Sequence, residues 1–258
     1  GKYLDDMDMN EMYEKLVDNP EVKKKKINSR ELLVKISQSQ KESGYPYIFF
    51  KDNANKEHAL KEIGDIKFSN LCTEIMQLSE VSDINPYYEE DIIRRGISCN
   101  LGSLNIATVM ENKRIKEATK AAIDSLTMVS DLTNIDVVPT IKKANEELHS
   151  VGLGAMNLHG FLAKNFIMYE SKEALDFCNV FFMMLNYYSL ERSMEIAKER
   201  GEVFKDFEKS EYANGNYFNK YVEKDFLPQT DKVKELFEGI HIPSREDWEN
   251  LKNDVMKY

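Results

Sequence analysis

Apolar residues recur at helical spacing near the start of the chain. Over residues 9–17 they fall on one face of a helix, which predicts a short amphipathic helix ended by an Asn-Pro pair. A second helix is predicted over 29–42. Asn28 and Glu31 have the spacing of a capping box, and Gly44 suits the end of a helix.

The second half of the chain contains the longer helical patterns. An amphipathic helix is predicted over 115–132, and it must end before Pro139. Ser171 opens a further helix that ends at Gly201, a residue suited to a left-handed cap. Its middle, 177–190, is apolar almost all round, which indicates a helix buried on most sides. Shorter helices are expected over 155–164 and around Trp248, Leu251 and Val255, the last one capped by Ser244 to Asp247.

Extended segments are fewer than helices. Short apolar runs bounded by turn residues indicate strands, and polar runs rich in Asn and Gly indicate loops. We therefore expect an α/β fold with more helix than strand. The predicted strands are 47–50, 66–78, 96–106 and 151–153, and the predicted loops are 51–64 and, with short helices at the surface, 212–221.

Charge and composition narrow the class of protein. Lys and Arg number 35 against 45 Asp and Glu, a net charge of −10, which argues against a nucleic-acid partner. The basic run 23–26 is expected to be a solvated helix face. Residues 177–190 are too few and too polar to span a bilayer, so no membrane partner is expected. The N-terminal residues lack the pattern of a signal peptide, which favours a cytoplasmic location.

The three cysteines are Cys72, Cys99 and Cys178, and in a reducing cytoplasm they are expected to be free, catalytic or transiently oxidised. No pair of them has metal-site spacing, so no metal is expected. Cys178 lies among apolar residues of the buried helix and is interpreted as a core thiol.

The segment around Cys72 carries the most informative pattern. In an extended backbone, Asn70, Cys72 and Glu74 would project from one face at intervals of roughly 7 Å. A strand with one wet face explains the same alternation. As chemistry, a carboxylate beside a thiol disfavours the thiolate, which does not suit a cysteine protease, and the set is poor for zinc. A neutral thiol between an amide and a carboxylate suits hydrogen-atom chemistry.

Two cysteine motifs together resemble the catalytic core of a known family. The first is Asn70-Leu71-Cys72-Thr73-Glu74, and the second is SCNLGSLN over 98–105, whose cysteine lies 27 residues after Cys72. Residues 44–48 (GYPYI), 151–157 (VGLGAMN) and 161–164 (FLAK) resemble further stretches of the same proteins. The family is the class I ribonucleotide reductase large subunit, and the class Ib enzymes of bacteria and phages are the most similar. The resemblance covers essentially the whole chain.

The resemblance implies a fold and a set of site residues. The family fold is a ten-stranded α/β barrel with the radical cysteine on a central finger loop. Residues 1–258 would be a single segment of that catalytic barrel domain, without the upstream nucleotide loops, the downstream phosphate loop or the tail. Cys72 would be the thiyl radical, Glu74 the base on the 3′-hydroxyl, and Asn70 the hydrogen-bonding partner of the ribose hydroxyls. Backbone groups of Leu71 and Thr73 would line the substrate pocket.

Cys99 would be one half of the dithiol that supplies the reducing equivalents, and its partner in the family lies upstream of anything in this sequence. The implied partners are a ribonucleoside diphosphate, a dimetal-containing small subunit that starts the radical, an external dithiol of thioredoxin or glutaredoxin type, and a second large subunit in a homodimer. No cofactor is expected to bind this segment directly. The segment alone is expected to be inactive.

Other interpretations stay open beside this one. The chain could be a non-catalytic complementing or assembly piece of a split reductase. A glycyl-radical or other thiol enzyme is disfavoured because no glycyl-radical loop is visible. A dinucleotide fingerprint at Gly152 and Gly154 is disfavoured because Asn157 replaces its third glycine, so tight packing of a strand on a helix is preferred. The four histidines are scattered and are interpreted as structural.

Overall fold

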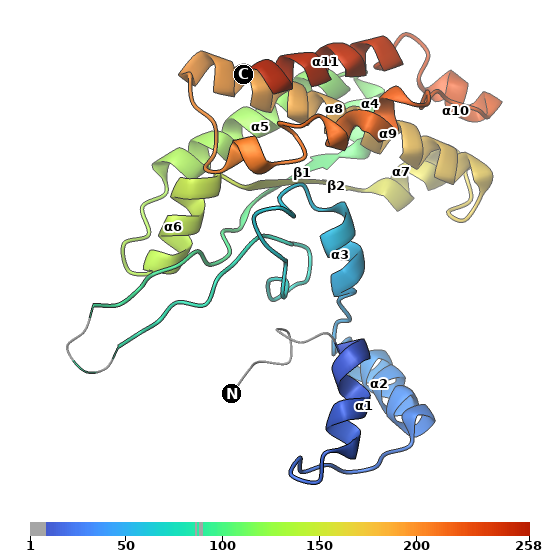
Figure 1. The fold of residues 1–258 in the computed structure, drawn as a ribbon. Coiled ribbons are helices and arrows are strands. Elements are labelled where there is room, and N and C mark those ends of the chain that lie inside the picture. Colours follow the sequence, from blue (N-terminus) through green and yellow to red (C-terminus); the bar gives the residue numbers. More distant parts are fainter. Residues whose placement is uncertain (1–8, 86, 88–89) are drawn as a thin grey trace.

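The computed structural model describes residues 9–85, 87 and 90–258, and its centre is a pair of parallel strands. Strand β1 (Asn100–Asn105) pairs with β2 (Val151–Met156), in a register that sets Asn100 opposite Val151 and Asn105 opposite Met156. Parallel strands need a crossover connection, which α4, α5 and α6 supply. Figure 1 shows α8, α9 and α11 above this pair, and the segment that leads from α3 to β1 below it.

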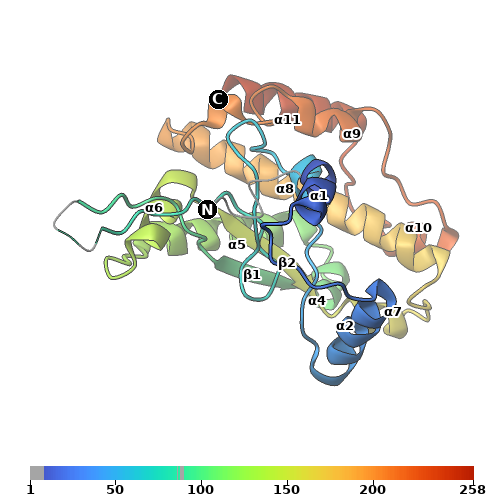
Figure 2. The ribbon, with the colours of Figure 1, turned by 60° about the horizontal axis from the view of Figure 1, so that its bottom comes forward.

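The fold is rich in helices, as the sequence predicts. Figure 2 shows from a second side how α8 runs along the sheet with α11 beside it. The helices are α1 (Met9–Asp18), α2 (Ser29–Ser43), α3 (Lys51–Glu57), α4 (Ile106–Glu111), α5 (Ile115–Leu132), α6 (Pro139–Leu148), α7 (Leu158–Lys164), α8 (Lys172–Arg200), α9 (Asn219–Val222), α10 (Asp231–Leu236) and α11 (Arg245–Lys257), with short 3₁₀ turns at Phe207–Lys209 and Asn216–Phe218.

Side-chain caps fix the ends of the predicted helices. Asn28 Oδ1 accepts a hydrogen bond from the backbone N–H of Arg30 at the start of α2. Ser171 caps α8 in the same way, and Gly201 ends that helix with a φ of 68°, in the left-handed region that glycine adopts without strain. Ser244 and Asp247 form the capping box of α11. These three helix predictions are confirmed.

The hydrophobic core surrounds α8. Phe177, Phe181 and Met184 in its middle are completely buried, which confirms the prediction of a helix covered on most sides. Trp248 of α11 is 1% exposed and stacks on Tyr221, with 4.0 Å between the ring centroids. The aromatic and aliphatic layer above the sheet therefore supplies most of the buried apolar area.

Helix α5 lies between the sheet and α8 and contacts both. A Cβ atom at Gly102 of β1 would lie 3.4 Å from Leu126 Cδ1, so the strand is in close contact with α5. On its other side α5 forms ion pairs with α8, including Arg192 Nε to Asp124 Oδ1 at 2.6 Å. Strand β1 therefore packs against one side of α5. Helix α8 contacts the other side of α5 through packing and ion pairs.

The structure corrects several predictions in the first third of the chain. Residues 47–50 form no strand, and Phe50 is 69% exposed. Where a loop was expected, α3 forms, and Asn55 ties it to Ile66 by accepting from the Ile66 N–H at 2.7 Å and donating to its carbonyl at 2.9 Å. The run 23–26 is solvated but not helical, and Lys24 Nζ donates to the Asn19 carbonyl beyond α1 at 2.7 Å.

Three later segments also differ from prediction. Residues 66–78 are irregular rather than a strand. Strand β2 continues to Met156, and α7 begins only at Leu158, because Asn157 takes a left-handed conformation with a φ of 66°. The segment 212–221 contains short helices as expected, but Phe218 within it is fully buried. Among the described residues, no helix has the length and apolar content needed to cross a membrane.

Candidate active site

Residues 70–75 form a tight turn. The Thr73 N–H donates to the Asn70 carbonyl at 3.1 Å, and the Asn70 N–H donates to the Ile75 carbonyl at 3.3 Å. The Asn70 side chain closes the turn from the other direction, because its Oδ1 accepts from the Ile75 N–H at 3.0 Å. Thr73 has a φ of 66°, an unfavourable conformation for a β-branched residue. The extended-strand prediction for this stretch is therefore wrong.

The turn leaves the predicted site residues accessible at its tip. Leu71 is 86% exposed, and Cys72 and Glu74 are exposed as well. Asn70 is half-buried, and its Oδ1 is already engaged with the backbone of Ile75.

Cys99 lies beside this turn, one residue before β1. Partial burial raises the pKa of the Cys99 thiol, the charges of Glu74 and Cys72 raise it further, and a hydrogen bond from the Asn70 side chain partly offsets this rise. Two thiols, a carboxylate and an amide therefore gather from segments that lie 27 residues apart in the sequence. Their arrangement keeps Cys99 protonated to a higher pH than an ordinary thiol.

Tyr47 lies near the site. It was expected in a buried strand, but it is 49% exposed. Its ring centroid lies 5.0 Å from that of Tyr45. A hydrogen bond with Tyr45 raises the pKa of the Tyr47 hydroxyl, and the charges of Cys72 and Glu74 add to the rise. The signal that could have found it is the 44–48 stretch, which belongs to the same resemblance as the cysteine motifs.

Cys178 lies apart from these groups, on α8, where it is half-buried against the core. Burial raises the pKa of its thiol. This agrees with the interpretation of Cys178 as a core thiol. Within the part of the chain that the structure describes, no three His, Cys, Asp or Glu side chains are grouped as a metal ion would need.

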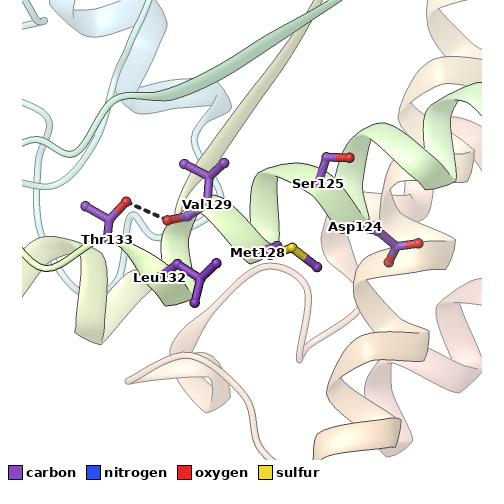
Figure 3. A pocket seen from close by; sticks show the side chains of 6 residues that line it. All are labelled: Asp124, Ser125, Met128, Val129, Leu132 and Thr133. Atoms are coloured by element: carbon purple, nitrogen blue, oxygen red, sulfur yellow. Dashed lines mark hydrogen bonds between the residues drawn. The ribbon is translucent and has the colours of Figure 1, made fainter.

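Two hollows in the surface do not coincide with the site. Figure 3 shows the first, on α5, where Thr133 Oγ1 donates to the Val129 carbonyl at 2.5 Å; its lining residues are Asp124, Ser125, Met128, Val129, Leu132 and Thr133. The second has a volume of about 1060 Å³ and is lined by α8, by 202–207, by 146–151 and, beside the Cys72 turn, by Met76, Gln77 and Leu78. Neither is lined by Asn70, Cys72, Glu74 or Cys99. Cys72, Glu74 and Cys99 are instead exposed at the surface.

Gly152 of β2 has a packing role. A Cβ atom at Gly152 would lie 2.6 Å from Leu101 Cδ2, so the close approach is between the two strands rather than between a strand and a helix as expected. The preference for packing over a nucleotide fingerprint agrees with this contact.

A parallel strand pair joined by helices, with Cys99 directly before one strand, is consistent with part of an α/β barrel. Comparison with known proteins agrees, since residues 2–258 match the family model described as "Ribonucleotide reductase, barrel domain". The chain belongs to the ribonucleotide reductase family. The expectation of a helix-rich segment of its α/β barrel is confirmed.

Two relatives align with the whole length of the chain. It is 58% identical over 258 residues to the ribonucleoside-diphosphate reductase subunit alpha of Bacillus subtilis (strain 168), and 45% identical over 263 residues to that of Mycoplasma pneumoniae. Among solved structures, the class Id ribonucleotide reductase alpha subunit of Actinobacillus ureae matches 75% of the chain, with a TM-score of 0.53 and 25% identity. The chain spans 37%, 36% and 35% of these three proteins, respectively.

Proposed function

We propose that this chain carries the radical thiol and one reducing thiol of a ribonucleoside-diphosphate reductase large subunit. The observation that carries the proposal is the exposed turn of Asn70, Cys72 and Glu74. Two hydrogen bonds between Gln77 and Ser98 join this turn to the segment that contains Cys99. The names of the relatives, all alpha subunits of such reductases, support the same reaction.

Each group has a role that its position supports. Cys72, at the tip of the turn, takes the 3′-hydrogen of a ribonucleoside diphosphate as a thiyl radical, and Glu74 accepts the proton of the 3′-hydroxyl. The Asn70 amide and the backbone of Leu71 and Thr73 hold the ribose. A dithiol that includes Cys99 supplies two electrons and two protons and becomes a disulfide, so that the 2′-hydroxyl leaves as water and a hydrogen takes its place at C2′. Cys72 then returns the hydrogen atom to C3′ and is a thiyl radical again.

The chemistry requires groups from outside this chain. The radical at Cys72 is proposed to come from a separate small subunit with a dimetal centre, and an external dithiol of thioredoxin or glutaredoxin type reduces the disulfide. Cys178 is held in the core, so the second thiol beside Cys99 is proposed to belong to another segment of the reductase. We also propose that the large subunit is a homodimer and works in the cytoplasm, where thiols stay reduced.

The test is CDP reduction by a large subunit that contains this segment, with small subunit and dithiol present. Cys72→Ser should abolish dCDP formation while leaving the circular dichroism spectrum unchanged, and Cys178→Ala is the matched control that should retain activity. If Cys72→Ser retains activity, the radical role is refuted and the alternative, a complementing piece of a split reductase, is favoured.

A further inference from the structure

Two arms of the chain run antiparallel between the Cys72 turn and Cys99. Asp83 and Ile92 exchange both of their backbone hydrogen bonds, at 3.0 and 2.8 Å. Three residues further along each arm, the Glu80 N–H donates to the Arg95 carbonyl at 2.8 Å. The arms therefore keep one register as they approach the site.

The next contact, three residues further again, is made by a side chain. Gln77 Nε2 donates to the Ser98 carbonyl at 2.7 Å, and the Ser98 N–H donates to Gln77 Oε1 at 3.1 Å. The Gln77 amide thus binds both polar groups of one peptide backbone position, as a paired strand residue would. Ser98 directly precedes Cys99, and Gln77 follows Ile75, which closes the Cys72 turn.

Helix α6 holds the residues on both sides of Cys99 by side-chain hydrogen bonds. Asn145 of α6 accepts from Asn100 Nδ2 at 2.8 Å and from Ser98 Oγ at 3.3 Å, so it holds the residues on both sides of Cys99. Ser98 and Asn145 are 3% and 4% exposed. The segment that contains Cys99 is therefore anchored to α6 by Asn145. The Cys72 turn, in contrast, is tied to that segment through Gln77.

We propose that Gln77 is a positioning residue that holds the Cys72 turn at a fixed distance and orientation from Cys99. Its catalytic meaning rests on the proposed function, because a thiyl radical and a reducing dithiol must act on the same ribose. An amide is suited to this task, since it donates and accepts at once and carries no charge that would alter the thiols.

Chemical bridging of the two thiols tests the geometry directly. In a Cys178→Ala background Cys72 and Cys99 are the only thiols of residues 1–258, and a short bis-methanethiosulfonate reagent can join them within one chain. The rate of bridging is followed by peptide mass spectrometry. Gln77→Ala should slow bridging by about tenfold, the effect expected when two hydrogen bonds of ordinary net strength are lost. The rate at which a one-ended reagent labels each thiol should not change.

Gln38→Ala is the matched control. Gln38 is exposed on α2 and its Nε2 donates to Glu42 Oε1 at 2.9 Å in the same helix, so bridging should keep the parental rate. If Gln77→Ala unfolds the chain, Gln77→Glu replaces it, because it keeps an acceptor for the Ser98 N–H but loses the donor to the Ser98 carbonyl. Bridging at the parental rate in a folded Gln77 variant would overturn the proposal.

The bridging assay needs neither substrate nor small subunit, so it is independent of the proposed function. In the assembled reductase, Gln77→Ala should lower kcat for CDP reduction and also raise KM, since Asn70 and the backbone of Leu71 and Thr73 lie on the same turn as Cys72 and are displaced with it. An active Cys72→Ser enzyme would refute the proposed function while the Gln77 contact stood. Parental bridging in Gln77→Ala would refute the contact alone.

Discussion

Replacing Asn145 by alanine removes the buried hydrogen bonds behind Cys99. Asn145 Oδ1 accepts from Asn100 Nδ2, Ser98 Oγ and Ser130 Oγ, and Asn145 Nδ2 donates to the Ser130 carbonyl at 2.8 Å. Ser98 and Ser130 are 3% and 2% exposed, so water cannot readily replace the lost partner. The variant therefore leaves the Ser98 hydroxyl without its acceptor and leaves the Ser130 hydroxyl only the longer contact to His149 Nδ1 at 3.5 Å.

The magnitude follows from the number of groups left unsatisfied. Each buried polar group without a partner costs about 1–3 kcal/mol, and the half-buried Asn100 can turn to water, so we expect a loss of roughly 3 kcal/mol in the free energy of unfolding. That is a large share of the roughly 5–15 kcal/mol that stabilises a typical domain. For a chain of this length it corresponds to a fall in Tm of about 6–12 °C.

Urea denaturation followed by far-UV circular dichroism measures this loss, because the fold is largely helical. Asn134→Ala is the matched control. Asn134 is exposed, its Nδ2 donates to Asp136 Oδ2 at 2.9 Å, and its removal should cost less than about 0.5 kcal/mol. A loss in Asn145→Ala no greater than in Asn134→Ala would refute the reasoning.

A double-mutant cycle tests the cause of the loss. Ser98→Ala in the Asn145→Ala background removes one of the unsatisfied hydroxyls, so the double variant should be more stable than the sum of the single effects by about 1 kcal/mol. Simple additivity would mean that the Ser98 hydroxyl finds another partner, and the count of unsatisfied groups would then be wrong.

Three other perturbations have definite outcomes. Glu74→Gln removes a charge that raises the pKa of Cys99, so alkylation of Cys99 should begin at lower pH. The parent loses stability as pH rises from the pKa of the unfolded thiol to the raised Cys99 pKa, so the variant should lose less stability over a narrower pH range, and an unchanged profile would contradict this. Thr73→Gly removes a left-handed threonine and should raise the stability by about 1 kcal/mol, measured as Tm; a lower Tm would contradict it. Trp248→Ala should cost about 3–5 kcal/mol in urea denaturation and Trp248→Phe much less, whereas equal losses would exclude packing as the cause.

The helices could be predicted because their signals are local. Ser171 and Gly201 mark the two ends of α8, and Ser244 with Asp247 starts α11; each cap acts within one turn of the chain, so short sequence windows contain it. The apolar middle of α8 likewise predicts its burial without knowledge of its neighbours. Such elements need no tertiary contact for their assignment.

The candidate site could be predicted only in part. Asn70, Cys72 and Glu74 were placed on one face of a strand, whereas the side chain of Asn70 bonds to the Ile75 N–H and turns the backbone. Alternation of residue types cannot distinguish these cases, because the deciding bond joins a side chain to the backbone. The nearness of Cys99 depends on contacts between distant segments, and it entered the sequence analysis only through the family resemblance. That the four residues perform catalysis is still a proposal.

Trp248 is the one tryptophan of the chain, and its place in the fold gives the protein two separate reporters of unfolding. Its indole, on α11, is stacked on Tyr221 and donates from Nε1 to Met183 Sδ of α8 at 3.4 Å. Figure 1 shows α8 and α11 above the sheet. Tryptophan emission therefore reports on this helical layer alone, while labelling of the exposed Cys72 and Cys99 reports on the turn and the start of β1. The same denaturation midpoint from both signals would identify one cooperative unit. Thiol labelling at a lower denaturant concentration than the change in tryptophan emission would identify the thiol segment as a unit that opens by itself.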